Sequence, residues 1–160
     1  MVDIKPGLER LGLELPEVVP PVAVYQPAVR SGNYIYVSGQ LPVKDGEIVA
    51  TGKVGAEVDL DQAYDLARLC ALNGLAAIGS VIDFSELKSI VKVVGFVASA
   101  PGFNTQPKVI NGASEFLGDV LGEAGKHARS AVGVSELPLN VPVEIEFIAE
   151  LNQSGTTYLA

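Results

Sequence analysis

Two runs of residues near the C-terminal end combine residue types and a spacing that could do chemistry. Arg129 begins one β-rich run, Arg129–Ser135, and Glu144 and Glu146 alternate with apolar residues in a second run, Val143–Ala149. Side chains two residues apart lie on the same face of a strand. If the two runs pair as a hairpin, Arg129 and Glu144 lie near each other on the face away from the helices.

Small residues beside the arginine would leave room for a ligand. Ala131 and Gly133 share a face with Arg129, whereas Val132 and Val134 are predicted to point into the core. A guanidinium can bind a carboxylate through two parallel hydrogen bonds, and a glutamate can exchange a proton with water. The arginine–glutamate pair therefore predicts either an interfacial salt bridge or a site that binds a carboxylate and activates water.

Other kinds of chemistry find little support in the sequence. It contains no phosphate-binding loop, no metal-spaced His/Cys set and no nucleophile elbow, so we predict no metal and no cofactor. Cys70 lies in the middle of an apolar helical stretch, which favours a core residue over a nucleophile. His127 is expected at a loop or strand start, with an acid–base role as the alternative.

Composition limits the class of protein. The 160 residues suit a single domain, and 48% are hydrophobic with only 19% charged. No apolar stretch approaches the ~20 residues that cross a membrane, and the first residues lack the apolar core of a signal peptide. The net charge of -8 disfavours nucleic-acid binding. One cysteine excludes an internal disulfide and fits a cytoplasmic location.

Hydrophobic spacing and turn residues predict the elements. We expect a short helix within residues 1–15, an extended linker over 16–21, strands at 22–29, 34–38 and 48–50, a hairpin turn at 44–47, a helix over 60–78 capped by Asp59, a strand at 90–98, a helix from about 105 to 121, strands at 129–135 and 143–149, and a polar tail from 152. Gly39 should end the second strand. The second long helix should bury Val109, Ala113, Phe116, Leu117, Val120 and Leu121. This order predicts an α+β fold with two helices on one face of a mixed sheet.

One predicted strand points to an oligomer. The run 90–98 is apolar on both faces, with Ile90, Val94 and Phe96 on one and Val91, Val93 and Val97 on the other. Two helices can cover only one of these faces, so we expect a second copy of the chain to cover the other.

Several motifs together resemble the Rid (reactive intermediate deaminase, YjgF-like) family. They are Tyr36–Pro42 (YVSGQLP), Ala128–Val134 (ARSAVGV), Leu137–Pro138 and Val143–Ala149 (VEIEFIA), with Tyr25-Gln26-Pro27 where the family has a tyrosine-led segment. The resemblance covers residues 22–150. Residues 1–21 resemble the N-terminal extension of a longer branch, and 151–160 form a C-terminal tail.

The resemblance implies a chorismate-mutase-like fold and a homotrimer with a central barrel and clefts between subunits. It also implies hydrolysis of reactive enamines and imines to 2-keto acids and ammonia. By motif, Arg129 would bind the substrate carboxylate and Glu144 would position or activate water. The remaining expected substrate-binding residues are Tyr25, Ser38, Gly39 and Ala131.

Some positions depart from the family pattern. Ala131 stands where well-known members have a cysteine, and Gln26-Pro27 replaces Ser-Gln. A family asparagine near the start of the second long helix aligns with Ile110 or, with a slip of one residue, Asn111. A trimer that binds 2-keto acids without turnover is therefore an alternative function. A ribonuclease or translation-inhibitor role is a third, which the acidic charge disfavours.

Overall fold

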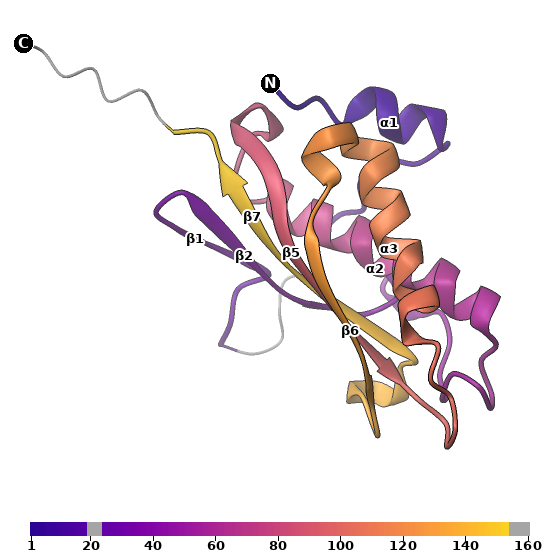
Figure 1. The fold of residues 1–160 in the computed structure, drawn as a ribbon. Coiled ribbons are helices and arrows are strands. Elements are labelled where there is room, and N and C mark those ends of the chain that lie inside the picture. Colours follow the sequence, from indigo (N-terminus) through magenta and orange to yellow (C-terminus); the bar gives the residue numbers. More distant parts are fainter. Residues whose placement is uncertain (19–23, 154–160) are drawn as a thin grey trace, which may run out of the picture.

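The computed structural model describes residues 1–18 and 24–153, and in this part of the chain two long helices cover one face of a five-stranded sheet (Figure 1). The strand order is β1-β2-β7-β5-β6, and all neighbours are antiparallel except β5 and β6. The predicted α+β fold with a mixed sheet is confirmed. Its elements are β1 (Ala28–Ser31), β2 (Tyr34–Gln40), β5 (Leu87–Ala98), β6 (Ala128–Val134), β7 (Val143–Leu151), α2 (Leu60–Gly79) and α3 (Gln106–Leu121).

The two long helices begin and end close to where the sequence predicts. The Asp59 carboxylate accepts a hydrogen bond from the Gln62 amide (2.8 Å) and so caps α2. Gly122 ends α3 with a φ of 58° and a ψ of -130°, a backbone conformation with positive φ that glycine adopts without strain. The predicted buried stripe of α3 is confirmed: Val109, Ala113, Phe116, Leu117, Val120 and Leu121 are all buried.

Strand β7 separates the two faces of the sheet as predicted. Val143, Ile145, Phe147, Ala149 and Leu151 are buried against the helix-covered face. The glutamates between them project from the opposite face, which no helix covers among the described residues. We call this opposite face the open face.

Strand β5 corrects the predicted faces of residues 90–98. Its pairing with β7 shifts register between Ile90 and Lys92, so Ile90 and Val93 both point to the helices while Val91 is 37% exposed. A bulge places one extra residue in the strand and thereby reverses the alternation beyond it. Val94 and Phe96 consequently lie on the open face.

The last two strands do not pair as a hairpin, so the condition under which Arg129 and Glu144 would be neighbours is not met. β6 pairs only with β5, and β5 lies between β6 and β7. The connecting segment includes the 3₁₀ helix η3 (Pro138–Asn140) and is long enough to pass the end of β5. The predicted faces of β6 are wrong, because Val132 is 42% exposed on the open face while Ala131 packs against the core.

The N-terminal helix is short and lies within the predicted residues 1–15. Helix α1 (Lys5–Arg10) packs against α3, where the Arg10 guanidinium donates to the Asp119 carbonyl (2.6 Å). Among the described residues the first strand begins at Ala28, so residues 24–27 of the predicted strand 22–29 do not belong to it, and residues 22–23 lie outside the described part. Pro27 has no N–H for a strand ladder, although its carbonyl accepts from the Ser38 amide (2.9 Å). Strand β2 continues through Gly39 instead of ending there.

The predicted hairpin around residues 44–47 is confirmed. β3 (Val43–Lys44) pairs with β4 (Glu47–Ile48) across Asp45 and Gly46, which both have positive φ. The 3₁₀ helices η1 (Phe84–Glu86) and η2 (Gly122–Gly125) follow α2 and α3. Asn152, at the start of the predicted tail, bonds to the Glu86 carbonyl (2.8 Å). Parts of the predicted linker and tail, and the predicted boundary at 21/22, fall in 19–23 and 154–160, outside the described residues.

The contact between α2 and α3 gives a test of the packing. A β-carbon on Gly112 would collide with the backbone carbonyl of Tyr64 on α2, whereas one on Gly118 would meet nothing within 4 Å. We expect Gly112→Ala to lower the free energy of unfolding by ~1–3 kcal/mol through overpacking. Gly118→Ala, on the same helix, should raise it by ~0.5–1 kcal/mol. Urea unfolding measures both, and equal effects would contradict the close helix contact.

Candidate functional site

Glu144 and Gly39 lie against each other, as two of the predicted site residues should. Glu144 projects from β7 on the open face, and its carboxylate occupies the space that a side chain at Gly39 would fill. Because this carboxylate is the flexible end of a side chain, any larger residue at position 39 would displace it. The close approach of the Glu144 carboxylate therefore explains the glycine at position 39. Backbone conformation does not explain it, because the φ of Gly39 is not positive.

Ser38 holds the neighbouring loop in place. Its hydroxyl donates to the Gln26 carbonyl (2.6 Å), and the amide of Gln40 donates through Nε2 to the Ser38 carbonyl (2.9 Å). The loop that carries Tyr25 is therefore fixed next to Glu144 and Gly39. The Tyr25 side chain itself is 53% exposed.

The carboxyl group of Glu144 is electrostatically unusual. Its pKa is raised above the ordinary value of 4.5, first because the group is half-buried and second because the Glu146 carboxylate lies two residues along β7. Within residues 1–18 and 24–153, Glu144 forms neither a hydrogen bond nor an ion pair through its side chain. A raised pKa brings a carboxyl group nearer to the range in which it can both accept and donate a proton.

Arg129 lies elsewhere, at the edge of the sheet and on its helix-covered side. Its Nη1 donates to the Asn111 side-chain oxygen (2.8 Å) and to the Ser114 hydroxyl (3.2 Å), both on α3. Nη2 makes only a long contact with the Pro107 carbonyl (3.4 Å). The prediction that Arg129 points away from the helices is wrong, because the face assignment of β6 was reversed.

Arg129 and Glu144 are consequently separated within one chain. Phe96 on β5 pairs with Glu144 on one side and with Val132 on the other. Val132 is three residues from Arg129 along β6. Three residues and two strand spacings each correspond to ~10 Å. The two side chains also leave opposite faces of the sheet, so one chain brings together Glu144, Gly39 and Ser38 and separately holds Arg129 and Ala131.

Three polar residues around Arg129 were not predicted as site residues. The family asparagine aligns with either Ile110 or Asn111. Ile110 is buried in the core, whereas Asn111 binds Arg129. Ser114 contacts both Arg129 and His127, whose Nε2 lies 3.0 Å from the Ser114 hydroxyl. His127 and Arg129 are two residues apart, and this spacing was a signal that they share a face.

The ring of His127 is held from both sides. Its Nδ1 lies 2.6 Å from the Gly125 carbonyl in η2. Burial lowers the pKa of His127, and the positive charge of Arg129 acts in the same direction, while the bond to Gly125 opposes them. The neutral imidazole is therefore favoured.

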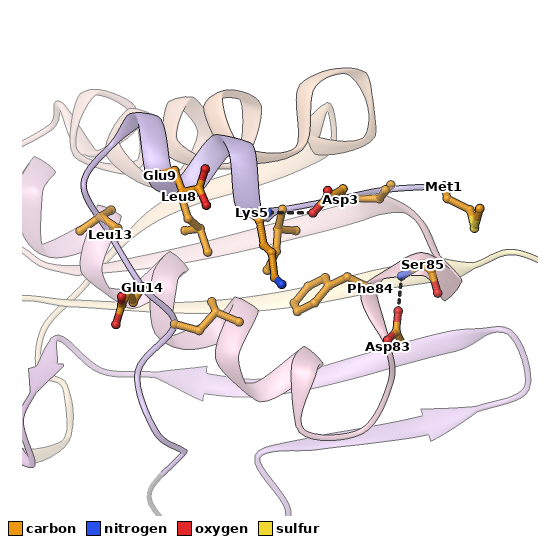
Figure 2. A pocket seen from close by; sticks show the side chains of 13 residues that line it. Met1, Asp3, Lys5, Leu8, Glu9, Leu13, Glu14, Asp83, Phe84 and Ser85 are labelled. Atoms are coloured by element: carbon orange, nitrogen blue, oxygen red, sulfur yellow. Dashed lines mark hydrogen bonds between the residues drawn. The ribbon is translucent and has the colours of Figure 1, made fainter.

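A large cavity of about 750 Å³ lies apart from both groups. It opens between α1 and η1, where Lys5 and Phe84 point toward each other (Figure 2). None of the six predicted site residues lines it. Among the described residues, no cluster of metal-ligating side chains is found, and no helix is long and apolar enough to cross a membrane.

Comparison with known proteins shows the family to which the chain belongs. The model of the family described as "YjgF/chorismate mutase-like, putative endoribonuclease" matches residues 7–151. The chain belongs to the YjgF/Rid family. The match begins within the segment predicted to be an N-terminal extension, and so it does not confirm that extension.

Relatives of this YjgF/Rid chain carry different names. Protein TCP17 of Trypanosoma cruzi is 40% identical over 91% of this chain and 92% of its own. A 2-iminobutanoate/2-iminopropanoate deaminase of Dermatophagoides farinae is 33% identical over 80% of this chain and 86% of its own.

Solved structures share the fold. Atu1372 of Agrobacterium tumefaciens, a protein of unknown function, is 48% identical with a TM-score of 0.87, and 93% of this chain and 92% of that one align. E. coli TdcF with bound serine is 27% identical with a TM-score of 0.56, covering 82% of this chain and 91% of that one. One solved structure similar to this chain thus holds serine, a small molecule with a carboxylate.

The pKa of Glu144 can be tested directly. In a ¹³C NMR titration of the carboxyl groups, we expect Glu144 to titrate above 4.5, and Glu146→Gln to lower that pKa because the neighbouring negative charge is gone. Glu150→Gln is the matched control. Residue 150 lies ~20 Å further along β7, beyond the Debye length of about 8–10 Å. An unchanged Glu144 titration in Glu146→Gln would contradict the electrostatic coupling.

Proposed function

We propose that the protein hydrolyses reactive enamines and imines to 2-keto acids and ammonia in clefts between the subunits of a homotrimer. The observation that carries this proposal is the half-buried Glu144 carboxylate, which has a raised pKa and lies against Gly39. Family membership and the deaminase relative support it. The substrate is a small molecule with a carboxylate, and no cofactor takes part.

The exposed sheet supports an oligomer, and the family resemblance supplies the number three. Val29, Tyr34, Tyr36 and Val132 are each between 41% and 49% exposed on the open face or its edges. Exposed apolar side chains of this kind are typical of protein interfaces. Three open faces turned inward would form the central barrel, and the edge strand β6 of one protomer would lie beside β2 and β7 of the next.

Such an arrangement resolves the separation of Arg129 and Glu144. In each cleft, Arg129 and Ala131 come from one protomer, while Glu144, Gly39, Ser38 and Tyr25 come from its neighbour. The Nε and Nη2 edge of the guanidinium is available for a bidentate bond to the substrate carboxylate, since α3 binds mainly Nη1.

The chemistry then needs one group that transfers protons. An enamine first takes a proton at carbon and becomes a protonated imine. Water adds to the imine carbon while Glu144 accepts one proton from the water, which gives a neutral carbinolamine. Glu144 returns that proton to the nitrogen. The C–N bond then breaks, the hydroxyl oxygen forms the C=O bond and gives its proton back to Glu144, and ammonia leaves the 2-keto acid.

Kinetics of single variants test the roles. Imines are generated in the assay by an amino-acid oxidase, and their disappearance is followed with semicarbazide. Glu144→Gln should lower kcat by ~10²–10⁴-fold because proton transfer is lost. Arg129→Ala should mainly raise KM, by ~10–100-fold, through loss of a charged hydrogen bond. Arg30→Ala, which breaks only an exposed ion pair with Glu86, is the control. Full activity in Arg129→Ala would contradict the proposal.

Mixed trimers test whether each cleft draws on two protomers. Arg129→Ala and Glu144→Gln chains, each impaired alone, are co-expressed with different tags, and the trimers that carry both tags are purified. Each such trimer has two copies of one variant and one of the other, so about a third of its clefts combine an intact Arg129 with an intact Glu144. At subsaturating substrate, recovery of about a third of wild-type activity is expected. No recovery in verified mixed trimers would place both residues in one protomer's site and contradict the cleft described above.

Ala131 favours one second candidate, a trimer that binds 2-keto acids without turnover. Alanine supplies no thiol, and it packs toward the core. Calorimetric binding of 2-ketobutyrate, abolished by Arg129→Ala in a protein with no deaminase activity, would select this function.

The remaining expectations belong to the same proposal. Residues 1–21 would form an extension to a domain of residues 22–150, with 151–160 as a tail. The acidic charge of -8 per chain disfavours RNA as a substrate. A cytoplasmic location is also proposed.

A further inference from the structure

Hydrogen-bond directions around His127 are fixed by one carbonyl. The Gly125 carbonyl can only accept, so the His127 Nδ1 beside it must carry a proton. In the neutral ring, Nε2 is then an acceptor, and the Ser114 hydroxyl must donate to it. The lone pairs of the Ser114 oxygen consequently remain free to accept from Nη1 of Arg129.

These hydrogen bonds form a chain, here called the relay, from the Gly125 carbonyl in η2 through His127 and Ser114 to the Arg129 guanidinium on β6. Every donor has an acceptor only while His127 is neutral. A proton on Nε2 would turn that nitrogen into a donor, so the Ser114 hydroxyl would lose the acceptor for its own proton. Two cations, His127 and Arg129, would then flank one hydroxyl.

We propose that Ser114 and His127 are positioning residues that hold Arg129 in its carboxylate-binding orientation, and that protonation of His127 releases this hold. The inference rests on the proposed role of Arg129 in binding the substrate carboxylate. Binding of the substrate carboxylate then depends on pH through His127, a residue that does not touch the substrate.

The charges around His127 are compatible with this role. Arg129 on β6 is the cation that faces it. In η2, Glu123 pairs with the exposed Lys126 (2.6 Å), and on α3 the contacting side chain is the uncharged Ser114. On β5, Lys92 donates to Ser130 on the open face, away from the ring.

Arginine is a flexible side chain, and a bidentate bond to a carboxylate requires its plane to be fixed. Asn111 and Ser114 both bind Nη1, while Nη2 makes only the long contact with the Pro107 carbonyl (3.4 Å) and Nε has no partner among the described residues. Removing Ser114 from this pair leaves one hydrogen bond where there were two. The orientation of the free edge is then less restricted.

The test measures binding of 2-ketobutyrate by calorimetry and deaminase kinetics at pH 7.5. Ser114→Ala and His127→Leu should each weaken binding about threefold to tenfold, the effect of one lost hydrogen bond, and raise KM with little change in kcat. His127→Gln should retain more of the affinity than His127→Leu, because its side-chain oxygen can accept from Ser114. Lys126→Gln, at an exposed neighbour, is the matched control.

A pH series separates positioning from a general loss of structure. Wild-type affinity should fall as the pH decreases below about 6.5, where an imidazole takes up its proton. The His127→Gln variant cannot titrate there and should lose this step. Titration of Glu144 occurs in both proteins and cancels in the comparison. Circular dichroism and urea unfolding verify that each variant is folded.

The outcomes distinguish the two proposals. If Arg129→Ala binds 2-ketobutyrate as well as the wild type, the proposed function fails. If Arg129→Ala loses binding while folded Ser114→Ala and His127→Leu bind like the wild type, the relay is overturned and the proposed function stands. A fall in kcat with unchanged KM in both His127 variants would instead assign an acid–base role and overturn positioning.

Discussion

The place of β5 between β6 and β7 is the constraint on which any site in this protein depends. β5 pairs with both strands and keeps Arg129 and Glu144 two strands apart. Strand alternation then sends the two side chains to opposite faces. No rotamer change can bring them together, because the backbone of a buried strand would have to move.

In the proposed intersubunit site, each half is prepared within its own chain. Arg129 is bound at one edge of its guanidinium by α3, and the packing of α3 on the sheet fixes that contact. Glu144 is placed by Gly39 and by the loop that Ser38 holds. A site assembled from two prepared halves loses little conformational entropy when the halves meet, which is the benefit of preorganised groups.

The sequence was sufficient for the parts of the fold that depend on local pattern. The faces of β7, the cap at Asp59 and the positive φ of Gly122 follow from residue type and spacing. The bulge after Ile90 and the order of the strands do not, because both depend on tertiary packing that single-strand alternation does not encode. The face of Arg129 was therefore misassigned, whereas family motifs named Glu144 and Gly39 separately as site residues, and their contact is seen only in the structure. Ser114 and His127 were missed because their link to Arg129 joins a helix to a strand.

The state of Glu144 is the strongest physical sign that its surroundings are made for function rather than stability. Burial and the neighbouring Glu146 both oppose its charge, and among the described residues no cation compensates for it. A carboxyl group with a raised pKa is more stable protonated, so its ionisation lowers stability as the pH rises through that pKa. A chain selected only for stability would replace it with a smaller polar or apolar residue. Retaining it is reasonable where an approaching imine, with its developing positive charge at nitrogen, supplies the missing cation, so that the interaction is stronger with the reacting molecule than with the empty protein.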